Sequence, residues 1–119
     1  MDKDILEFVA QKTRELISSP TCCPEARAAA RAWLDALGTA QQEAVTQQYI
    51  NELEEDIMPI ENLIAFADSD AGKGYFGADK AAGIAVHARD IQAAGAKYCD
   101  CPACAAIEAI LEKKAQLLP

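Results

Sequence analysis

Five cysteines are the residues of this sequence with the clearest chemistry. They fall into two groups, Cys22-Cys23-Pro24 and Cys99-Asp100-Cys101-Pro102-Ala103-Cys104. Each group contains a Cys-Pro step, and proline fits the first position of a helix. Cys23 and Cys101 are therefore predicted to be the N-cap residues of two helices, with Cys104 in the first turn of the second one. A helix N-terminus stabilises a thiolate, which is the form that binds a metal or attacks a disulfide.

The spacing C-x-C-x-x-C places three sulfurs within one loop and one helical turn, close enough to share an ion. Structural zinc takes four ligands, and thiolates are common among them. We therefore predict a zinc site made by Cys99, Cys101 and Cys104, with the fourth ligand from Cys22 or Cys23. Such a site requires the two predicted helix starts to lie together, and it would couple zinc binding to folding.

Two other interpretations of the cysteines stay open. Cys101 and Cys104 form a C-x-x-C pair, the form of a redox-active dithiol at a helix start. The pair lacks the alternating strands and helices in which that motif usually works. In the third interpretation the chain is a helical interaction module, and its cysteines are reduced thiols that only pack or cap helices, because buried cysteine is common.

Three further patterns are weaker. His87 lies on an apolar stripe of its predicted helix, where a packed histidine is commoner than a ligand, so it is a reserve metal ligand only. Asp68, Asp70 and Asp79 take three positions of a calcium loop, but neither the fifth nor the sixth position has the residue type that calcium needs. The run GKGYFG at residues 72–77 matches a dinucleotide fingerprint by letters but follows no strand, so we interpret it as a flexible loop. No serine or carboxylate spacing around His87 suggests a nucleophile–base pair.

Apolar residues recur at helical spacing in nearly every segment, and none alternates long enough to be a strand. We expect an all-α fold, an irregular bundle of five or six helices that forms a single domain across residues 1–119. Proline and glycine set the boundaries, with a kink or break at Pro59 and a loop at residues 68–74. The expected helices cover about residues 4–18, 24–37, 41 to the break at 59, 59–67, 78–94 and 102–118.

Composition narrows the partners. Nineteen acidic residues against eleven basic ones give a net charge of −8, so nucleic acid and anionic membranes are excluded as partners. The acidic run at residues 52–56 is interpreted as a solvated helix face. No apolar run is long enough to span a membrane, and the first residues lack the layout of a secretion signal. We therefore expect a cytoplasmic protein whose cysteines stay reduced, and the odd number of cysteines agrees with that expectation.

Three stretches carry a resemblance that spans nearly the whole chain: TCCPEARAAARAWLDALG, ELEEDIMPIENLIAFA and AGAKYCDCPACAAIEAILEKK. With them the chain resembles a group of short helical bacterial proteins, mostly from anaerobes, that share the YCDCPAC block. Such proteins often carry an automatic label naming the ninety-kilodalton heat-shock chaperone. That chaperone is several times longer and has an α/β ATPase domain, for which this chain has no room. The resemblance therefore implies a compact helical fold, and it supplies no catalytic residues. The function predicted is that of a non-enzymatic helical domain that binds zinc and acts through another protein.

Overall fold

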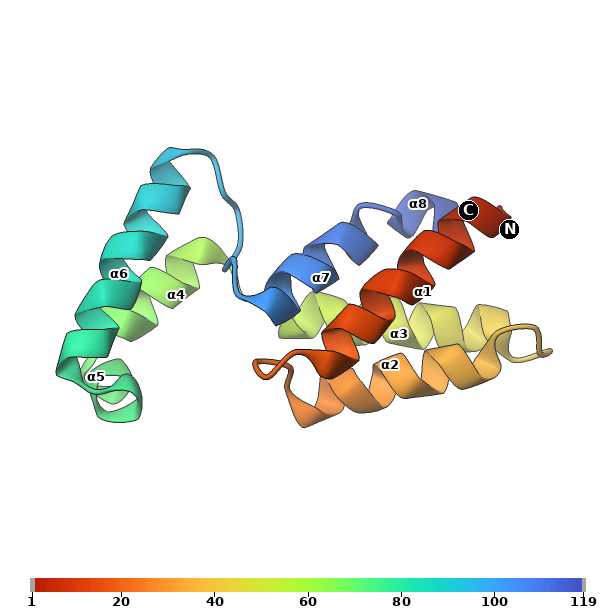
Figure 1. Ribbon diagram of the computed structural model, residues 1–119, viewed down its shortest axis with the longest axis horizontal. Helices are drawn as coiled ribbons and strands as arrows, with labels where there is room; N and C mark the ends of the chain where they lie inside the picture. The colour runs from red at the N-terminus through yellow and green to blue at the C-terminus, as the bar shows by residue number, and fades with distance from the viewer. Residues whose placement is uncertain (1, 119) are drawn as a thin grey trace. The chain divides into compact units, whose positions relative to one another are not determined.

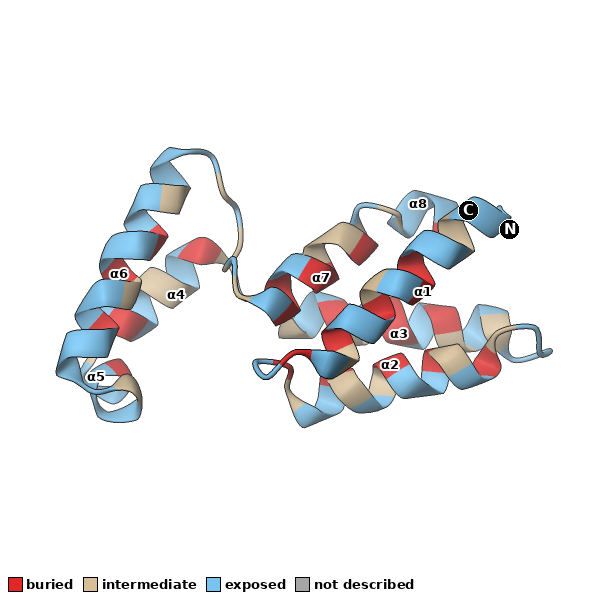
Figure 2. Ribbon diagram, in the orientation of Figure 1, coloured by how far each residue is buried: buried red, intermediate tan, exposed pale blue. Residues whose placement is uncertain are grey.

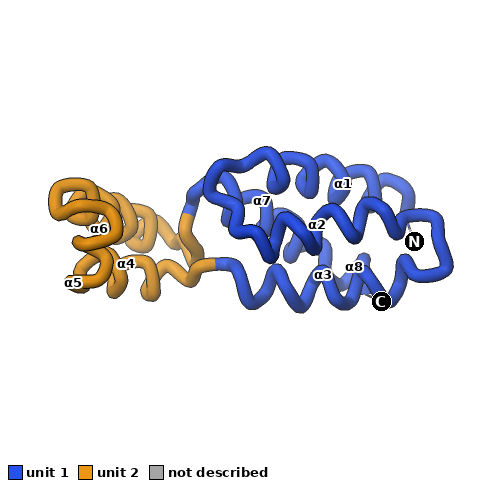
Figure 3. The backbone as a smooth tube through the Cα atoms, turned by 90° about the horizontal axis from the view of Figure 1, so that it is seen from below, with its two compact units in different colours: residues 1–57, 100–119 blue, residues 58–99 orange. Residues whose placement is uncertain are grey.

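A computed structural model describes residues 2–118 of the chain. Eight helices lie within these residues, 77% of the structure is helical and no strand is present there, so the predicted all-α class is confirmed. The helices number eight rather than five or six. The chain divides into two compact units, unit 1 (Met1–Ile57 with Asp100–Pro119) and unit 2 (Met58–Cys99) (Figure 3). A single domain across residues 1–119 stays a prediction.

Unit 1 contains five helices: α1 (Lys3–Ser18), α2 (Pro24–Ala36), α3 (Gln42–Asp56), α7 (Pro102–Leu111) and α8 (Lys114–Leu117). Helix α1 packs against α2 and α7, and α3 packs against the same two helices (Figure 1). The short α8 contacts α1. Helix α7, from the C-terminal part of the sequence, thus packs beside α1, from its beginning.

The core of unit 1 is built around two aromatic rings. Trp33 and Tyr49 are fully buried and stack with their ring centroids 5.5 Å apart. Trp33 Nε1 donates a hydrogen bond of 3.0 Å to Thr46 Oγ1, and the Tyr49 hydroxyl lies 2.9 Å from Thr13 Oγ1. A buried polar group without a partner would destabilise the fold, so these pairings let large amphipathic rings fill the core. Figure 2 shows buried residues at intervals along the helices of this unit.

Unit 2 contains α4 (Ile60–Asp68), α5 (Asp70–Phe76) and α6 (Ala78–Ala93), which all pack against one another. Its buried residues are mostly small: Ile60, Ala67, Gly72, Ala81, Ala85 and Ala88. Arg89 of α6 pairs with Asp68 of α4 at the surface. The helices of unit 2 therefore approach closely over alanine and glycine.

The two ends of unit 2 are held side by side by a short paired segment, residues 58–60 with residues 97–99, which we call the stem. Pro59 and Tyr98 face each other in an antiparallel bridge. On either side of them, Ile60 N–H donates to the Lys97 carbonyl at 2.9 Å and Cys99 N–H donates to the Met58 carbonyl at 2.8 Å. The predicted break at Pro59 is confirmed, because α3 ends at Asp56 and α4 begins at Ile60.

The predicted loop at residues 68–74 is wrong, because α4 runs to Asp68 and α5 begins at Asp70. Ser69 caps α5: the Ser69 Oγ accepts a hydrogen bond of 3.0 Å from Gly72 N–H. Gly72 lies so close to the end of α4 that an added Cβ would clash with the Phe66 carbonyl oxygen. Glycine therefore serves here for close packing rather than for flexibility. The second added helix is α8, because the expected last helix is interrupted by a turn at residues 112–113.

The structure also shows where the residues of the three weaker sequence patterns lie. The run at residues 72–77 belongs to α5 and its C-cap, Gly77, rather than to a flexible loop. Asp68, Asp70 and Asp79 lie on three different helices rather than in one loop. His87 is exposed, so the prediction that it lies on a buried stripe is wrong. Helix α6 buries its alanines instead.

No helix among residues 2–118 has the length and apolar character to cross a membrane.

Candidate metal centre

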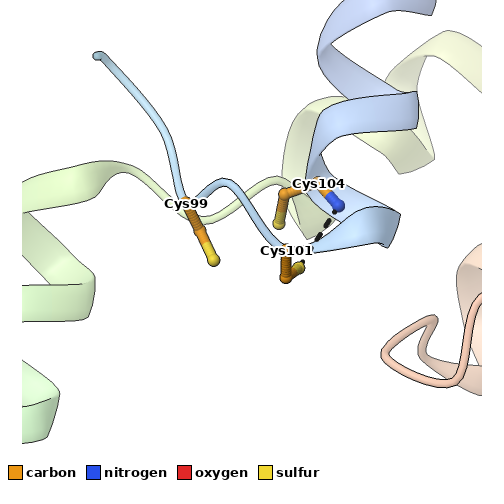
Figure 4. A group of neighbouring side chains, drawn as sticks. All are labelled: Cys99, Cys101 and Cys104. Atoms are coloured by element: carbon orange, nitrogen blue, oxygen red, sulfur yellow. Dashed lines mark hydrogen bonds between the residues drawn. The ribbon is translucent and has the colours of Figure 1, made fainter. Parts of the chain in front are cut away.

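The second cysteine group leads from the stem of unit 2 into α7. Cys101 is the N-cap of α7, with extended backbone (φ −60°, ψ 157°), and Pro102 takes the first helical position. The Cys101 Sγ accepts a hydrogen bond of 3.4 Å from Cys104 N–H (Figure 4). The predicted cap is confirmed, and it fixes the sulfur of Cys101 beside the first turn that carries Cys104.

Three sulfurs gather at this point. The Sγ atoms of Cys99, Cys101 and Cys104 all lie within 4.8 Å of one another. Zinc–thiolate bonds of about 2.3 Å place sulfurs about 3.8 Å apart in a tetrahedral site. A shift of about 1 Å would therefore bring the three into ligand positions. Cys104 is buried, while Cys99 and Cys101 are half-buried, so the group reaches from the core to the surface.

The start of α7 is held in place within unit 1. Ala103 N–H donates a hydrogen bond of 3.3 Å to Thr21 Oγ1, in the loop that leads into α2. The helix then buries its apolar side, which includes Cys104, Ile107 and Ile110. Two of the three cysteines of the group are thus attached to a helix that is packed along its length.

The first cysteine group caps α2 in the same way. The Cys23 Sγ accepts a hydrogen bond of 3.4 Å from Ala26 N–H, which confirms the predicted cap. The Cys22 thiol donates to the Cys23 carbonyl at 3.4 Å. Neither sulfur belongs to the group of three. A fourth ligand from Cys22 or Cys23 stays a prediction, and the structure brings together Cys99, Cys101 and Cys104.

The electrostatic surroundings of Cys22 and Cys23 favour the protonated thiol. Burial raises the pKa of Cys22, and the nearby Arg27 guanidinium offsets this only in part. Burial also raises the pKa of Cys23. The hydrogen bond from Ala26 N–H lowers this pKa in part, and the charges of Asp56 and Glu25 raise it further. Because metals bind thiolates, these two thiols bind an ion less readily at neutral pH.

Asp56 is the residue of this region that the sequence did not single out. It ends α3, the Cys23 thiol donates a hydrogen bond to its carboxylate, and its Oδ2 atom is buried without a hydrogen-bond partner. Burial raises its pKa, and Glu25 and Glu55 add to the rise. The acidic run at residues 52–56 is therefore not uniformly solvated. The only signal in the sequence is its place, at the end of that run and just before the break at Pro59.

The other ligand candidates lie elsewhere. His87 and the aspartates of the possible calcium loop are not in the sulfur group, and no second group of this kind occurs in the described part of the chain, residues 2–118. Comparisons of the chain with protein-family models, with characterised proteins and with solved structures find no match. The resemblance to short helical bacterial proteins accordingly stays a prediction.

Proposed function

We propose that this protein is a non-enzymatic helical domain that binds zinc through Cys99, Cys101 and Cys104 and acts by binding another protein. The observation that carries the proposal is the gathering of three sulfurs within 4.8 Å at the start of a packed helix. Three thiolates in one place repel one another, and a divalent cation relieves that repulsion. The N-terminus of α7 adds a favourable field for the negatively charged cluster.

Zinc is the ion that this donor set favours. Thiolate ligands select zinc and other soft ions over magnesium or calcium, which prefer oxygen. A zinc site made by thiolates therefore fits this chain better than a calcium site at Asp68 and Asp70.

The protein-binding part of the proposal is supported by an aromatic cluster on unit 2, in which Phe66 and Tyr75 are exposed and Phe76 is half-buried. The ring centroid of Phe66 lies 6.2 Å from that of Tyr75 and 5.9 Å from that of Phe76. Tyr75 is 77% exposed, far more than a tyrosine that serves the core. Exposed aromatic clusters are typical of protein interaction surfaces.

Metal analysis of the anaerobically purified full chain tests the metal centre directly. We expect about one zinc per chain, and cobalt in its place should give thiolate charge-transfer absorption. Removing the ion with a strong chelator under reducing conditions should lower the melting temperature, because structural zinc is coupled to folding. A melting curve that the chelator leaves unchanged would contradict a structural role.

A matched pair of variants assigns the ligands. Serine is a good N-cap, so Cys101→Ser and Cys23→Ser should each keep the helix cap and lose only the sulfur. We expect Cys101→Ser to abolish cobalt binding and Cys23→Ser to leave it intact. Equal loss in both variants would assign a ligand to the first cysteine group.

A thiol–disulfide function of Cys101 and Cys104 is the second candidate. It is favoured by the hydrogen bond from Cys104 N–H to the Cys101 Sγ, which stabilises an attacking thiolate. The Cys101 thiolate would attack a partner's disulfide, and Cys104 would then release the partner as two thiols. Two electrons pass to the partner, and this chain keeps a Cys101–Cys104 disulfide.

Alkylation at several pH values separates this candidate from the metal centre. The redox function requires Cys101 to react faster than an ordinary thiol in the metal-depleted protein. Ordinary reactivity at Cys101 would eliminate it. Bound zinc would block the same sulfurs, so the two functions exclude each other in one molecule.

A further inference from the structure

Unit 2 contains a pocket of about 460 Å³ beside its stem. The lining comes from the stem, the first turn of α4, the last turn of α6 and the segment that joins α6 to the stem, all within unit 2. Pockets that bind small molecules have volumes of about 300–1,000 Å³. This pocket is therefore large enough for a small organic ligand.

Hydrogen bonds fix the backbone around the pocket. The paired strands of the stem close one side. On the other side, α6 is followed by a turn in which Gly95 has a φ of 104°. There Gly95 N–H donates to the Gln92 carbonyl and Ala96 N–H donates to the Ile91 carbonyl, each at 2.9 Å. A site whose backbone is already in place loses less conformational entropy when a ligand binds.

The pocket has an apolar lining at its base. Ile60 is only 2% exposed there, and Pro59, Ala96 and Tyr98 are half-buried. An apolar group of a ligand would displace water from these surfaces, which favours binding. One part of the ligand should therefore be apolar.

Two exposed side chains of opposite charge also line the pocket, Glu61 and Lys97. Among residues 2–118, neither forms an ion pair with the other or with a third residue, whereas Asp68 and Arg89 on the same unit do pair. A simple anion would be attracted by Lys97 and repelled by Glu61, and a simple cation the reverse. A ligand that carries both an ammonium group and a carboxylate can pair with both side chains.

We propose that this pocket binds a free α-amino acid with an apolar side chain. Glu61 pairs with the ammonium group, Lys97 pairs with the carboxylate, and the side chain lies on the apolar base at Ile60. The exposed amide of Gln92, which can donate and accept, is placed to bond either charged group. This binding site is independent of the proposed metal centre.

NMR titration of the reduced full chain with L-leucine tests the proposal. We expect amide shifts at residues 59–61 and 95–98, while amides of α2 and α3 stay unchanged. Acetyl-leucine lacks the ammonium group and leucinamide lacks the carboxylate. Each should bind about 2- to 5-fold more weakly than leucine, the effect expected of one exposed ion pair.

Two variants assign the charges. Glu61→Gln should weaken leucine binding by about 2- to 5-fold without weakening that of acetyl-leucine, which has no ammonium group to lose. Lys97→Met should weaken leucine binding to the same extent without weakening that of leucinamide. Asp79→Asn, in the first turn of α6, and Lys80→Met are matched controls, because both residues are exposed and neither lines the pocket. Both controls should leave leucine binding unchanged.

Three outcomes would overturn the proposal. The first is a leucine titration that shifts no amide around the pocket. The second is equal binding of leucine, acetyl-leucine and leucinamide, since the two charges would then play no part. The third is tighter binding of a leucine-containing tripeptide than of free leucine, because the pocket would then hold the end of a peptide chain.

Discussion

In unit 1 the helices bury large rings and branched side chains together with alanines, whereas in unit 2 nearly every buried residue is alanine or glycine. Trp33, Tyr49 and Ile50 are fully buried in unit 1, and the polar atoms of the two rings are hydrogen-bonded. In unit 2, Ala81 and Ala88 are fully buried, while Tyr75 and Val86 remain largely exposed. Large buried side chains contribute about 1.5–3 kcal/mol each, and alanine contributes far less.

The difference indicates two ways of stabilising packed helices. Unit 1 is stabilised by several large buried side chains. Unit 2 relies on close backbone approach, so its stability depends on positions where no side chain fits and on the stem that joins its ends. Substitutions in each unit should therefore have different effects.

The largest effect is expected from Trp33→Ala in unit 1. It empties the centre of the core and leaves Thr46 without the Trp33 Nε1 donor, so the free energy of unfolding should fall by about 3–5 kcal/mol. Urea unfolding followed by circular dichroism measures this, because Trp33 is the only tryptophan and cannot report in its own variant. A loss below about 1 kcal/mol would mean that unit 1 is not organised around this ring.

A smaller but more local effect is expected from Gly72→Ala in unit 2. The added Cβ would meet the Phe66 carbonyl at the end of α4, and a backbone atom there cannot move aside alone. We expect a cost of about 1–3 kcal/mol, seen as faster hydrogen exchange in α4 and α5.

Gly83→Ala is the matched control for that substitution. Gly83 lies within α6, and nothing is within 4 Å of an added Cβ. Alanine should stabilise the helix there by about 1 kcal/mol, because it restricts the unfolded chain more than glycine does. If both alanines change exchange in unit 2 by the same amount and sign, close approach at Gly72 is not what stabilises this unit.

The smallest effect concerns Asp56, a half-buried acid at the end of α3 in unit 1. Burial raises the pKa of Asp56 above its ordinary value of 3.8, so the folded chain favours the protonated acid. The stabilising contribution is then complete below pH 3.8 and is lost as the pH rises through the folded pKa. Asp56→Asn should therefore raise the melting temperature at pH 7 and have little effect at pH 3. A pH 7 melting temperature that falls in this variant would show that the ionised carboxylate is stabilising.

Much of the local structure was determined by the sequence alone. Helical spacing gave the all-α class, and the helix starts at Pro24 and Pro102 followed from the two Cys-Pro steps. The C-x-C-x-x-C spacing predicted the group of three sulfurs because all three lie within one loop and one helical turn. These features depend on residues a few positions apart, where bond geometry and capping leave few alternatives.

Tertiary structure alone decided which surfaces are buried and which distant residues meet. The periodicity of α6 allowed either its isoleucines and His87 or its alanines to face inward, and close packing with α4 and α5 selected the alanines. Residues 68–74 carried every sign of a loop, yet α4 runs to Asp68 and α5 begins at Asp70, with Gly72 packed against the end of α4. In the sequence Asp56 is one acid of an acidic run, and only the fold places Cys23 beside it. In each case the deciding contact joins segments whose approach depends on the packing of whole helices, and no local pattern specifies that approach.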